Sequence, residues 1–455
     1  MIKKNDIITT EIEEITGQGS GIAKIDGMAV FVPQTAVGDK INAHILKVKK
    51  NYAFAKVESI ITPSENRIQP DCECYSKCGG CVFRHIAYEE ELKIKQRRVF
   101  DALTRIGGLH DFDMGEIIGC KSPNSYRNKA QMPVGRDNDG SVITGFFAPH
   151  SHRIVKTDSC ALQPDEFNAI IRVVKNWITE NNISVYDETT HKGLVRHIYL
   201  RRSAEGAQIM VCLIINGKNL PNTDTLTEKL ILANKNITSI ILNINTNNTN
   251  VILGNKCITI YGSDTISDTL CGLKFNISPL SFYQVNRDQT ERLYALAAEY
   301  AELTGSELLI DLYCGAGTIG LSMADKVKSL IGVEIVPEAI QNAKENAKTN
   351  GIHNAEFICA DAEAAAKLLA KRRTRPDVVI IDPPRKGCAP SVIDSICEMS
   401  PSRVVYVSCD PETLARDLKL FDEKGYKTEK VTPVDMFPRT GHVETVVLMS
   451  RVEGK

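Results

Sequence analysis

The sequence predicts a multidomain α/β protein whose carboxyl-terminal part is a doubly wound parallel sheet. The chain has 455 residues, too many for one hydrophobic core, so we expect roughly two to four domains. Short segments rich in β-branched residues fill the first 62 residues and much of 120–280, whereas helical and strand patterns alternate from about residue 289. Near-continuous apolar strands that alternate with helices are typical of a buried parallel sheet.

The composition is that of an ordinary soluble protein, with 43% hydrophobic and 24% charged residues and a formal net charge of -1. Residues 1–10, MIKKNDIITT, lack the apolar region of a signal peptide. The longest apolar run, around 209–215, is too short to cross a bilayer. We therefore expect a cytoplasmic protein without membrane contact. In that compartment, its 14 cysteines indicate metal ligands or buried thiols rather than disulfides.

Residues 1–62 are predicted to form a small β-barrel. The segments IITTEI, AVFVP, INAHILKV and FAKVESI have strand composition, and Gly or Asp-Lys separates them. A five-stranded OB-type barrel, a fold that often binds oligonucleotides, fits this pattern. No helix follows GQGSG at 17–21, so we interpret it as a bulge or tight turn. The polar segment 63–70 resembles a linker.

Residues 63–280 are predicted to form a strand-rich central domain with two helices. Apolar residues recur at helical spacing in 89–106, a helix that can pack on the next domain, and a second helix covers 165–179. The expected strands are SVITGFFA, RHIYLRR, AQIMVCLII, SIILNIN and CITIYG. Between 121 and 156 lie six Lys or Arg residues and only two Asp, which fits a nucleic-acid contact and a solvated face equally well.

Residues 281–455 are predicted to form the doubly wound domain. Strands ELLIDLY, SLIGVEI, AEFICAD, DVVIIDPP and VVYVSCD alternate with helices expected at 291–303, 318–327, 337–351 and 362–373. Sheets of this class bind ligands at the carboxyl ends of their strands. We therefore expect the functional residues at those ends.

The first strand of this domain ends in DLYCGAGTIG, where Gly315, Gly317 and Gly320 match G-x-G-x-x-G. Glu334 ends the next strand, where a carboxylate can accept hydrogen bonds from a ribose diol. NAD and S-adenosylmethionine (SAM) both carry an adenosine ribose, and an empty glycine-rich turn is the third alternative. DPPRKG, which begins at Asp382, favours a methyltransferase, because two prolines make a rigid loop that can present a planar base beside a methyl donor.

A candidate nucleophile follows the next strand. Cys409 lies between VVYVS and a helix that Asp410-Pro411 opens, and the amino terminus of a helix favours a thiolate. A thiolate that adds to C6 of uracil makes C5 nucleophilic enough to take a methyl group, and a base must then remove the C5 proton. Glu444, just before the terminal apolar strand, is the candidate base, with His442 as its rival. The alternative for Cys409 is a buried structural thiol.

Four cysteines occur within DCECYSKCGGC at 71–81. From Cys74 the spacing is C-x3-C-x2-C, which is that of a radical cluster that cleaves SAM. From Cys72 it is C-x5-C-x2-C, a cluster site that needs a fourth ligand from elsewhere. Four thiolates also suit structural zinc. The spacing alone leaves these alternatives open.

Seven motifs together resemble one family, the class I SAM-dependent RNA uracil-5-methyltransferases. The motifs are YRNKAQ, DSCALQ, SFYQVN, LYCGAGTIGL, DPPRKG, VSCDPETLARD and HVETVVL. The amino-terminal barrel is similar to a TRAM domain. The nearest group is the 23S rRNA uracil-5-methyltransferases of RumA type, which combine a TRAM domain, an iron–sulfur cluster and a Rossmann-like methyltransferase domain. Transfer RNA relatives are the rival group.

The resemblance implies a complete set of site residues and partners. Cys409 would be the nucleophile and Glu444 the base. The SAM site would contain Gln284, Tyr313, Glu334, Asp361 and Asp382. One [4Fe–4S] cluster would be held by Cys72, Cys78, Cys81 and Cys160, with Cys74 as an extra thiol. The substrate would be a single-stranded or loop uridine of 23S rRNA, and we expect a monomer with no stable protein partner. A radical-SAM enzyme, an NAD-dependent oxidoreductase and a non-catalytic RNA-binding module are the alternatives.

Overall fold

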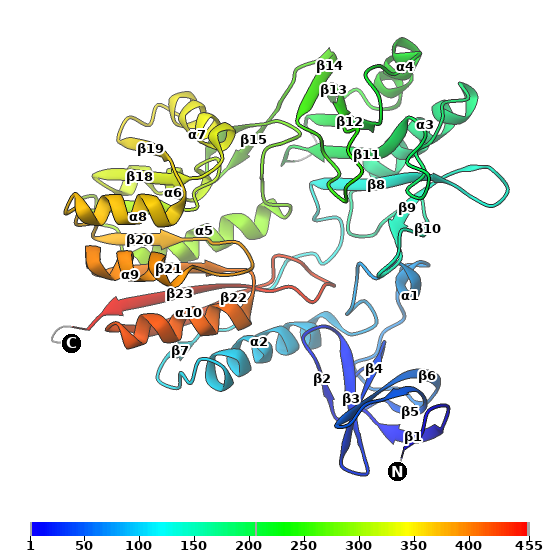
Figure 1. The fold of residues 1–455 in the computed structure, drawn as a ribbon, viewed down its shortest axis with the longest axis horizontal. Helices are drawn as coiled ribbons and strands as arrows, with labels where there is room; N and C mark the ends of the chain where they lie inside the picture. The colour runs from blue at the N-terminus through cyan, green and yellow to red at the C-terminus, as the bar shows by residue number, and fades with distance from the viewer. Residues whose placement is uncertain (1, 205–206, 453–455) are drawn as a thin grey trace. The chain divides into compact units, whose positions relative to one another are not determined.

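The computed structural model describes residues 2–204 and 207–452, which form two compact units (Figure 1). Unit 1 contains Met1–Pro123, Pro383–Ile393 and Tyr406–Lys455, and unit 2 contains Asn124–Asp382 and Asp394–Val405. The chain therefore leaves unit 1 and returns to it twice. No helix in the described ranges is long and apolar enough to cross a membrane.

The amino-terminal barrel of unit 1 has six strands in the order β1-β5-β6-β4-β3-β2. Side chains alternate along these strands, so that Val30, Val32, Ala53 and Ala55 are buried in its core. One strand more than predicted is present, because a two-residue strand pairs with β3. As expected, no helix follows 17–21: β3, which the sequence analysis did not predict, begins at Ser20. The strands are β1 (Ile7–Glu11), β2 (Glu14–Ile15), β3 (Ser20–Ile25), β4 (Met28–Pro33), β5 (Lys40–Val48) and β6 (Tyr52–Thr62).

The rest of unit 1 contains two long helices and an antiparallel strand pair. Helix α2 (Tyr88–Arg105) lies within one residue of its predicted bounds and packs against α10 (Pro411–Glu423). Strands β22 (Tyr426–Val434) and β23 (Glu444–Arg451) are antiparallel, and β7 (Asp113–Met114) is parallel to β22. The prediction of a wholly parallel sheet is therefore wrong here. An antiparallel pair needs no crossover helix, so the βα rhythm that indicated the parallel strands ends before β22.

Unit 2 begins with a seven-stranded sheet in the order β10-β9-β8-β11-β12-β13-β14. Helix α3 (Asp165–Glu180) packs its buried Trp177 into the core of this sheet. The sequence prediction missed α4 (Thr223–Ala233), which buries only two leucines but joins the parallel pair β12 and β13, a connection that requires a crossover. The strands are β8 (Lys129–Arg136), β9 (Val142–Phe147), β10 (Ile154–Lys156), β11 (Val195–Arg202), β12 (Ile209–Ile215), β13 (Ile237–Ile244) and β14 (Lys256–Gly262).

The second half of unit 2 is the predicted parallel sheet. A hairpin of β15 (Ile266–Leu270) and β16 (Leu273–Ile277) precedes α5 (Arg287–Ala301), and strands β19, β18, β17 and β20 are parallel neighbours in that order. Their bounds are β17 (Leu308–Leu312), β18 (Ser329–Glu334), β19 (Ala355–Cys359) and β20 (Val378–Ile381). The helices between them are α6 (Thr318–Leu321), the 3-10 turn η2 (Ala324–Lys326), α7 (Pro337–Thr349) and α8 (Ala362–Lys371).

Two details differ from the prediction for this half. The helix expected at 318–327 is only one α-helical turn followed by η2, and Gly320 and Ser322 in it are poor helix formers. The sequence analysis also missed α9 (Pro390–Met399), which precedes β21 (Arg403–Ser408). Both α9 and β21 have residues in each unit.

Candidate active site

The loop after β17 has a backbone shaped for close contact with a ligand. Tyr313, Gly315 and Gly317 have φ values of 67°, 54° and 81°, the left-handed region that glycine adopts without strain. A Cβ atom on Gly315 would meet no atom within 4 Å, so the loop faces open space there. A Cβ atom on Gly320 would lie 2.9 Å from Asp311 Oδ2, which explains glycine at the third motif position. We call residues 313–317 the cofactor loop.

Glu334, the last residue of β18, fixes the cofactor loop. Its carboxylate accepts hydrogen bonds from the Gly315 N–H at 3.2 Å and from the N–H groups of Ile335 and Val336 at 2.8 and 3.0 Å. The side chains of Ile335 and Val336 are 59% and 46% exposed. A carboxylate beside exposed apolar side chains can accept ribose hydroxyls while a flat base lies on the apolar surface.

Two carboxyl groups lie at the ends of the paired strands β17 and β20. Burial raises the pKa of Asp311 to about 7, and burial likewise raises the pKa of Asp382 to about 7. Asp311 Oδ2 accepts the Gly320 N–H at 2.9 Å, whereas its buried Oδ1 has no hydrogen-bond partner among the described residues. A positive charge nearby would stabilise the ionised form of either group. The sequence analysis missed Asp311, although a single charge in the apolar strand LLIDL was a usable signal.

The loop that carries Gln284 is held by the central sheet. Asn128 Nδ2 donates to the Gln284 carbonyl oxygen at 2.9 Å, and the Asn128 N–H donates to the Val285 carbonyl oxygen at 2.9 Å. The buried Arg201 donates to the carbonyl oxygens of Ser278 and Ser281 at 3.2 and 3.0 Å. The YRNKAQ motif therefore contributes a residue that positions this loop, a role that the sequence analysis did not assign.

Four of the five predicted SAM residues follow consecutive parallel strands. Tyr313, Glu334, Asp361 and Asp382 stand at the carboxyl ends of β17, β18, β19 and β20, and Gln284 precedes α5. Asp361 is exposed and caps α8, where it accepts the N–H groups of Glu363 and Ala364 at 3.0 and 3.4 Å. Since the carboxyl ends of parallel strands meet at one edge, this is the ligand edge expected for the fold.

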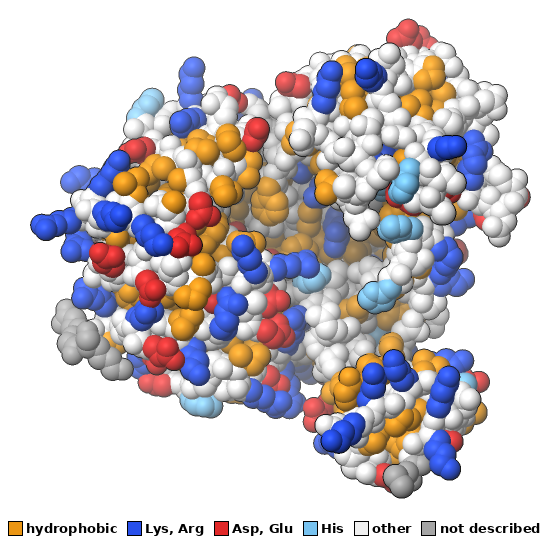
Figure 2. Space-filling view, in the orientation of Figure 1, with side chains coloured by type: hydrophobic (Ala, Val, Ile, Leu, Met, Phe, Trp, Pro, Cys, Tyr) orange, Lys and Arg blue, Asp and Glu red, His pale blue; other side chains and the backbone are white. Residues whose placement is uncertain are grey.

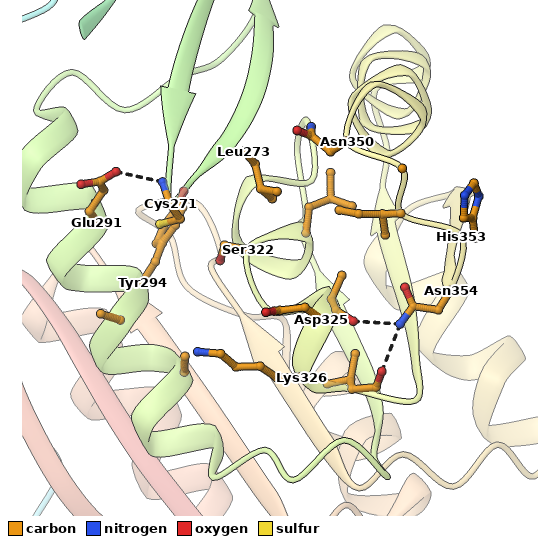
Figure 3. A pocket seen from close by; sticks show the side chains of 17 residues that line it. Cys271, Leu273, Glu291, Tyr294, Ser322, Asp325, Lys326, Asn350, His353 and Asn354 are labelled. Atoms are coloured by element: carbon orange, nitrogen blue, oxygen red, sulfur yellow. Dashed lines mark hydrogen bonds between the residues drawn. The ribbon is translucent and has the colours of Figure 1, made fainter. Parts of the chain in front are cut away.

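A large cavity of unit 2, with a volume of about 680 Å³, lies elsewhere (Figure 3). Its lining includes Lys326, His353 and Asn354, which precede the amino ends of β18 and β19, and none of the predicted SAM residues. Asn354 donates to the carbonyl oxygens of Ala324 and Val327, and Glu291 accepts the Cys271 N–H, so these polar groups already serve the fold. The cavity is therefore distinct from the ligand edge.

Cys409 and Glu444 both belong to unit 1. The half-buried Cys409 follows β21 and immediately precedes Asp410, whose carboxylate caps α10 by accepting the Thr413 N–H at 2.9 Å. Glu444 is the first residue of β23, opposite Val434, and is only 4% exposed. His442, the rival base, is half-buried with its ring edge-on to Phe437. A thiol at a helix amino terminus and a buried carboxyl group are the chemistry that a nucleophile and a base require.

A buried ion network fixes the segment that leads to Glu444. Lys95 Nζ on α2 donates to Glu91 at 2.8 Å, to Asp435 at 2.7 Å and to the Phe437 carbonyl oxygen at 3.2 Å. The Arg439 N–H donates to Glu91 at 2.6 Å. These side chains are almost wholly buried. The sequence analysis placed α2 correctly but did not predict this positioning role, because its partners lie about 340 residues away.

The cysteine segment, residues 71–81, forms a single helical turn. Cys74 caps α1 (Tyr75–Cys78), and Gly79 ends it with φ of 70°. Burial raises the pKa of Cys78, and the charges of Cys81, Cys72 and Cys74 raise it further. Cys160 is half-buried in unit 2.

Cysteine thiolates, the ligands that the cysteine segment offers, suit an iron–sulfur cluster or zinc. In the part of the chain that the structure describes, however, no group of three or more His, Cys, Asp or Glu side chains is arranged to hold a metal ion. Cys74 lies at a helix cap rather than at a strand end, which does not match the strand-end placement expected of a radical-SAM triplet.

The fold and the ligand edge are those expected of a SAM-dependent methyltransferase, and the family match shows that class. Residues 87–452 match the family "tRNA (Uracil-5-)-methyltransferase" and residues 3–57 match the TRAM domain. The chain belongs to this family of RNA uracil-5-methyltransferases and carries a TRAM domain.

Relatives over the whole chain agree with this assignment. The chain is 46% identical to an "Uncharacterized RNA methyltransferase" of Clostridium tetani over 99% of this chain and 97% of the relative. It is 45% identical to another from Halalkalibacterium halodurans, covering 98% of each chain. The solved Pyrococcus abyssi tRNA (uracil-54, C5)-methyltransferase, in complex with S-adenosyl-L-homocysteine, is 26% identical with a TM-score of 0.78, covering 97% of this chain and 100% of that one.

Proposed function

We propose that the protein transfers a methyl group from SAM to C5 of a specific uridine in 23S rRNA through a covalent adduct with Cys409. The observation that carries this proposal is the position of Cys409 at the amino terminus of α10, in the same unit as the buried Glu444. The resemblance of the motif set to the 23S rRNA group supports the choice of substrate.

Two residues of the chain would take part in the reaction, Cys409 as the nucleophile and Glu444 as the base. The Cys409 thiolate forms a bond from Sγ to C6 of the uracil ring, which places the electron pair of the C5–C6 double bond on C5. SAM supplies an electrophilic methyl group that C5 accepts, and the sulfur of SAM keeps the electron pair of the broken bond. Glu444 then accepts the C5 proton, the double bond re-forms, and the thiolate leaves C6.

We assign the SAM site to Gln284, Tyr313, Glu334, Asp361 and Asp382. The place of the last four at the carboxyl ends of the parallel strands supports this assignment. Asp311 joins this set, because its buried oxygen has no partner among the residues described and SAM is cationic at its sulfonium and amino groups. We retain the domain division into 1–62, 63–280 and 281–455 as part of the same proposal.

We further propose that Cys72, Cys78, Cys81 and Cys160 bind one [4Fe–4S] cluster. The resemblance to the 23S rRNA group and the C-x5-C-x2-C spacing of Cys72, Cys78 and Cys81 support this proposal. Iron, sulfide and zinc content of protein purified without oxygen distinguishes the cluster from structural zinc. Cys72→Ser should lose the metal and Cys74→Ser should keep it, whereas the reverse result assigns Cys74 as the ligand.

Transfer RNA is the second candidate substrate, because the Pyrococcus abyssi relative is named for a tRNA uracil. The test is methyl transfer from radiolabelled SAM to unmodified 23S rRNA and to unmodified tRNA, with mapping of the product base. We expect 5-methyluridine in 23S rRNA and none in tRNA. Methylation of tRNA alone would show that tRNA, rather than 23S rRNA, is the substrate. Methylation of neither RNA would contradict the proposed function.

A further inference from the structure

Arg98 on helix α2 contacts both of the segments that carry the proposed nucleophile and base. Its Nε and Nη2 atoms donate to the two carboxylate oxygens of Glu412 at 3.0 and 2.8 Å. Its Nη1 atom donates to the Gly441 carbonyl oxygen at 2.7 Å. Glu412 lies in the first turn of α10, three residues after Cys409. Gly441 lies three residues before Glu444, and all of these residues belong to unit 1. One guanidinium group therefore links the two segments.

The contacts of Arg98 differ from those of the surface ion pairs near it. Figure 2 shows acidic and basic side chains mixed over the visible surface of α2 and α10, where exposed pairs contribute little. Arg97, the preceding residue on α2, lies 3.7 Å from Asp101, and its side chain is 69% exposed. The side chain of Arg98 is only 13% exposed. Its bidentate pair with Glu412 fixes the orientation of the guanidinium group toward the Gly441 carbonyl oxygen.

The glycine turn at 17–21 of the amino-terminal barrel packs against the same contacts. A Cβ atom on Gly17 would lie 2.1 Å from Arg98 Cδ, and one on Gly441 would lie 2.7 Å from the Gly17 carbonyl oxygen. A larger residue at position 17 would therefore displace the Arg98 side chain from its partners. The backbone of the turn restricts where the guanidinium group can move. This packing gives the GQGSG motif a role that the sequence analysis, which interpreted it as a bulge or tight turn, did not assign.

We propose that Arg98 is a positioning residue that sets the Cys409 thiol and the Glu444 carboxyl group relative to one another. This inference rests on the proposed function for the roles of those two residues. The thiolate acts at C6 of the uracil ring and the base acts on the proton at C5, so the two groups must be aligned with adjacent carbons of one ring. A misplacement of about 1 Å can reduce a rate about a hundredfold. In this role Arg98 acts only through α10 and the loop before β23.

The test follows the two chemical steps separately in the full-length protein. The rate of adduct formation with RNA that contains 5-fluorouridine reports the nucleophile, because this step precedes proton removal. Single-turnover reactions with RNA tritiated at C5 of uridine report the base, because a methylated ring that keeps its tritium still awaits proton removal. Both rates are expressed per SAM-binding site, counted by calorimetry, so that a poorly folded variant does not mimic the effect.

We expect Arg98→Ala and Arg98→Lys to slow both steps by about tenfold or more. Lysine keeps the charge but lacks the planar fork that reaches two partners at once. Glu412→Ala should slow adduct formation alone, because Arg98 still donates to the Gly441 carbonyl oxygen in that variant. Arg97→Ala removes an exposed arginine from the same helix, so it is the matched control and should leave both rates unchanged.

Each outcome decides the inference. Wild-type rates of both steps in the two Arg98 variants would overturn it, and so would a Glu412→Ala variant that slows both steps equally. The failure of the proposed function is distinguishable from these results. If the wild type forms the adduct and methylates RNA while the Arg98 variants match it, only the positioning role is wrong. If the wild type forms no adduct and methylates no RNA, the proposed function is wrong, and the positioning role is wrong with it.

Discussion

The cofactor loop and the cysteine segment are both irregular, glycine-containing connections, but different parts of the fold hold them in place. The cofactor loop lies between β17 and α6, and Glu334 accepts a hydrogen bond from its backbone. In the cysteine segment, α1 is a four-residue helix with no buried residue. Its side-chain contacts include Arg84 with Asp71 and Tyr75 with His85. The parallel sheet thus shapes one site before any ligand arrives, whereas the proposed metal would have to hold the other site in place.

The largest expected effect is the loss of methyl transfer on removal of the Cys409 thiol, with SAM binding at the cofactor loop unchanged. Cys409→Ala should reduce methyl transfer by at least about a thousandfold, because the variant has no group to add to C6. The dissociation constant for SAM, measured by calorimetry, should stay unchanged, since the cofactor loop lies in the other unit. Substantial turnover in this variant would remove the basis of the proposed mechanism.

The next effect tests whether the buried ion network around Lys95 stabilises unit 1. Lys95→Met should reduce the free energy of unfolding by about 3–5 kcal/mol, because it leaves the buried Glu91 and Asp435 without their cation. Lys93→Met on the same helix is the control. Its pair with Glu90 is exposed on the lysine side, so we expect a change of less than about 1 kcal/mol in denaturant titrations. Equal effects of the two substitutions would mean that the buried network does not stabilise the fold.

Metal removal should distinguish the cysteine segment from the cofactor loop. We expect Cys78→Ser, or chelation of the wild type, to lower the melting temperature by about 5–10 °C, because a ligand that binds only the folded state stabilises it. Cys271→Ser, outside both regions, is the control and should keep the metal. SAM affinity should remain in the metal-free protein. A metal-free protein with an unchanged melting temperature would show that the segment holds its shape alone.

The last effect concerns the slope of stability against pH. The pKa of Asp311 is raised from 3.8 to about 7, so the folded state holds a proton that the unfolded state loses between these values. Stability contributed by this group is therefore present below about pH 4 and falls as pH rises to 7, by at most about 1.4 kcal/mol per pH unit. Asp311→Asn should flatten this decline in thermal unfolding curves, and Asp361→Asn, at an exposed cap, should not. An unchanged slope in Asp311→Asn would contradict the raised pKa.

Sequence patterns predicted those helices and strands that are determined by residues close together in the chain. The parallel strands and helix 89–106 were found because apolar periodicity suffices to define them. The predicted site residues Glu334 and Asp361 lie at strand ends or helix caps for the same reason. Family membership was likewise predicted, since ordered motifs carry it.

The missed features depend on partners distant in the chain. The network of Lys95 with Asp435, and the support of the Gln284 loop by Asn128, join residues 340 and 156 positions apart. Helix α4 has weak periodicity, and only the parallel pairing of β12 with β13 explains it. A single sequence does not reveal these pairings, because each partner looks like an ordinary polar or apolar residue where it stands.

Mass spectrometry of the protein with SAM and 5-fluorouridine-containing 23S rRNA tests the central claim most directly. Fluorine in place of the C5 proton blocks the final elimination, so the thiolate stays bonded to C6. The account predicts a stable RNA adduct on the peptide that contains Cys409, dependent on SAM and absent in Cys409→Ala. Methylated product without any adduct, or an adduct on another cysteine, would contradict it.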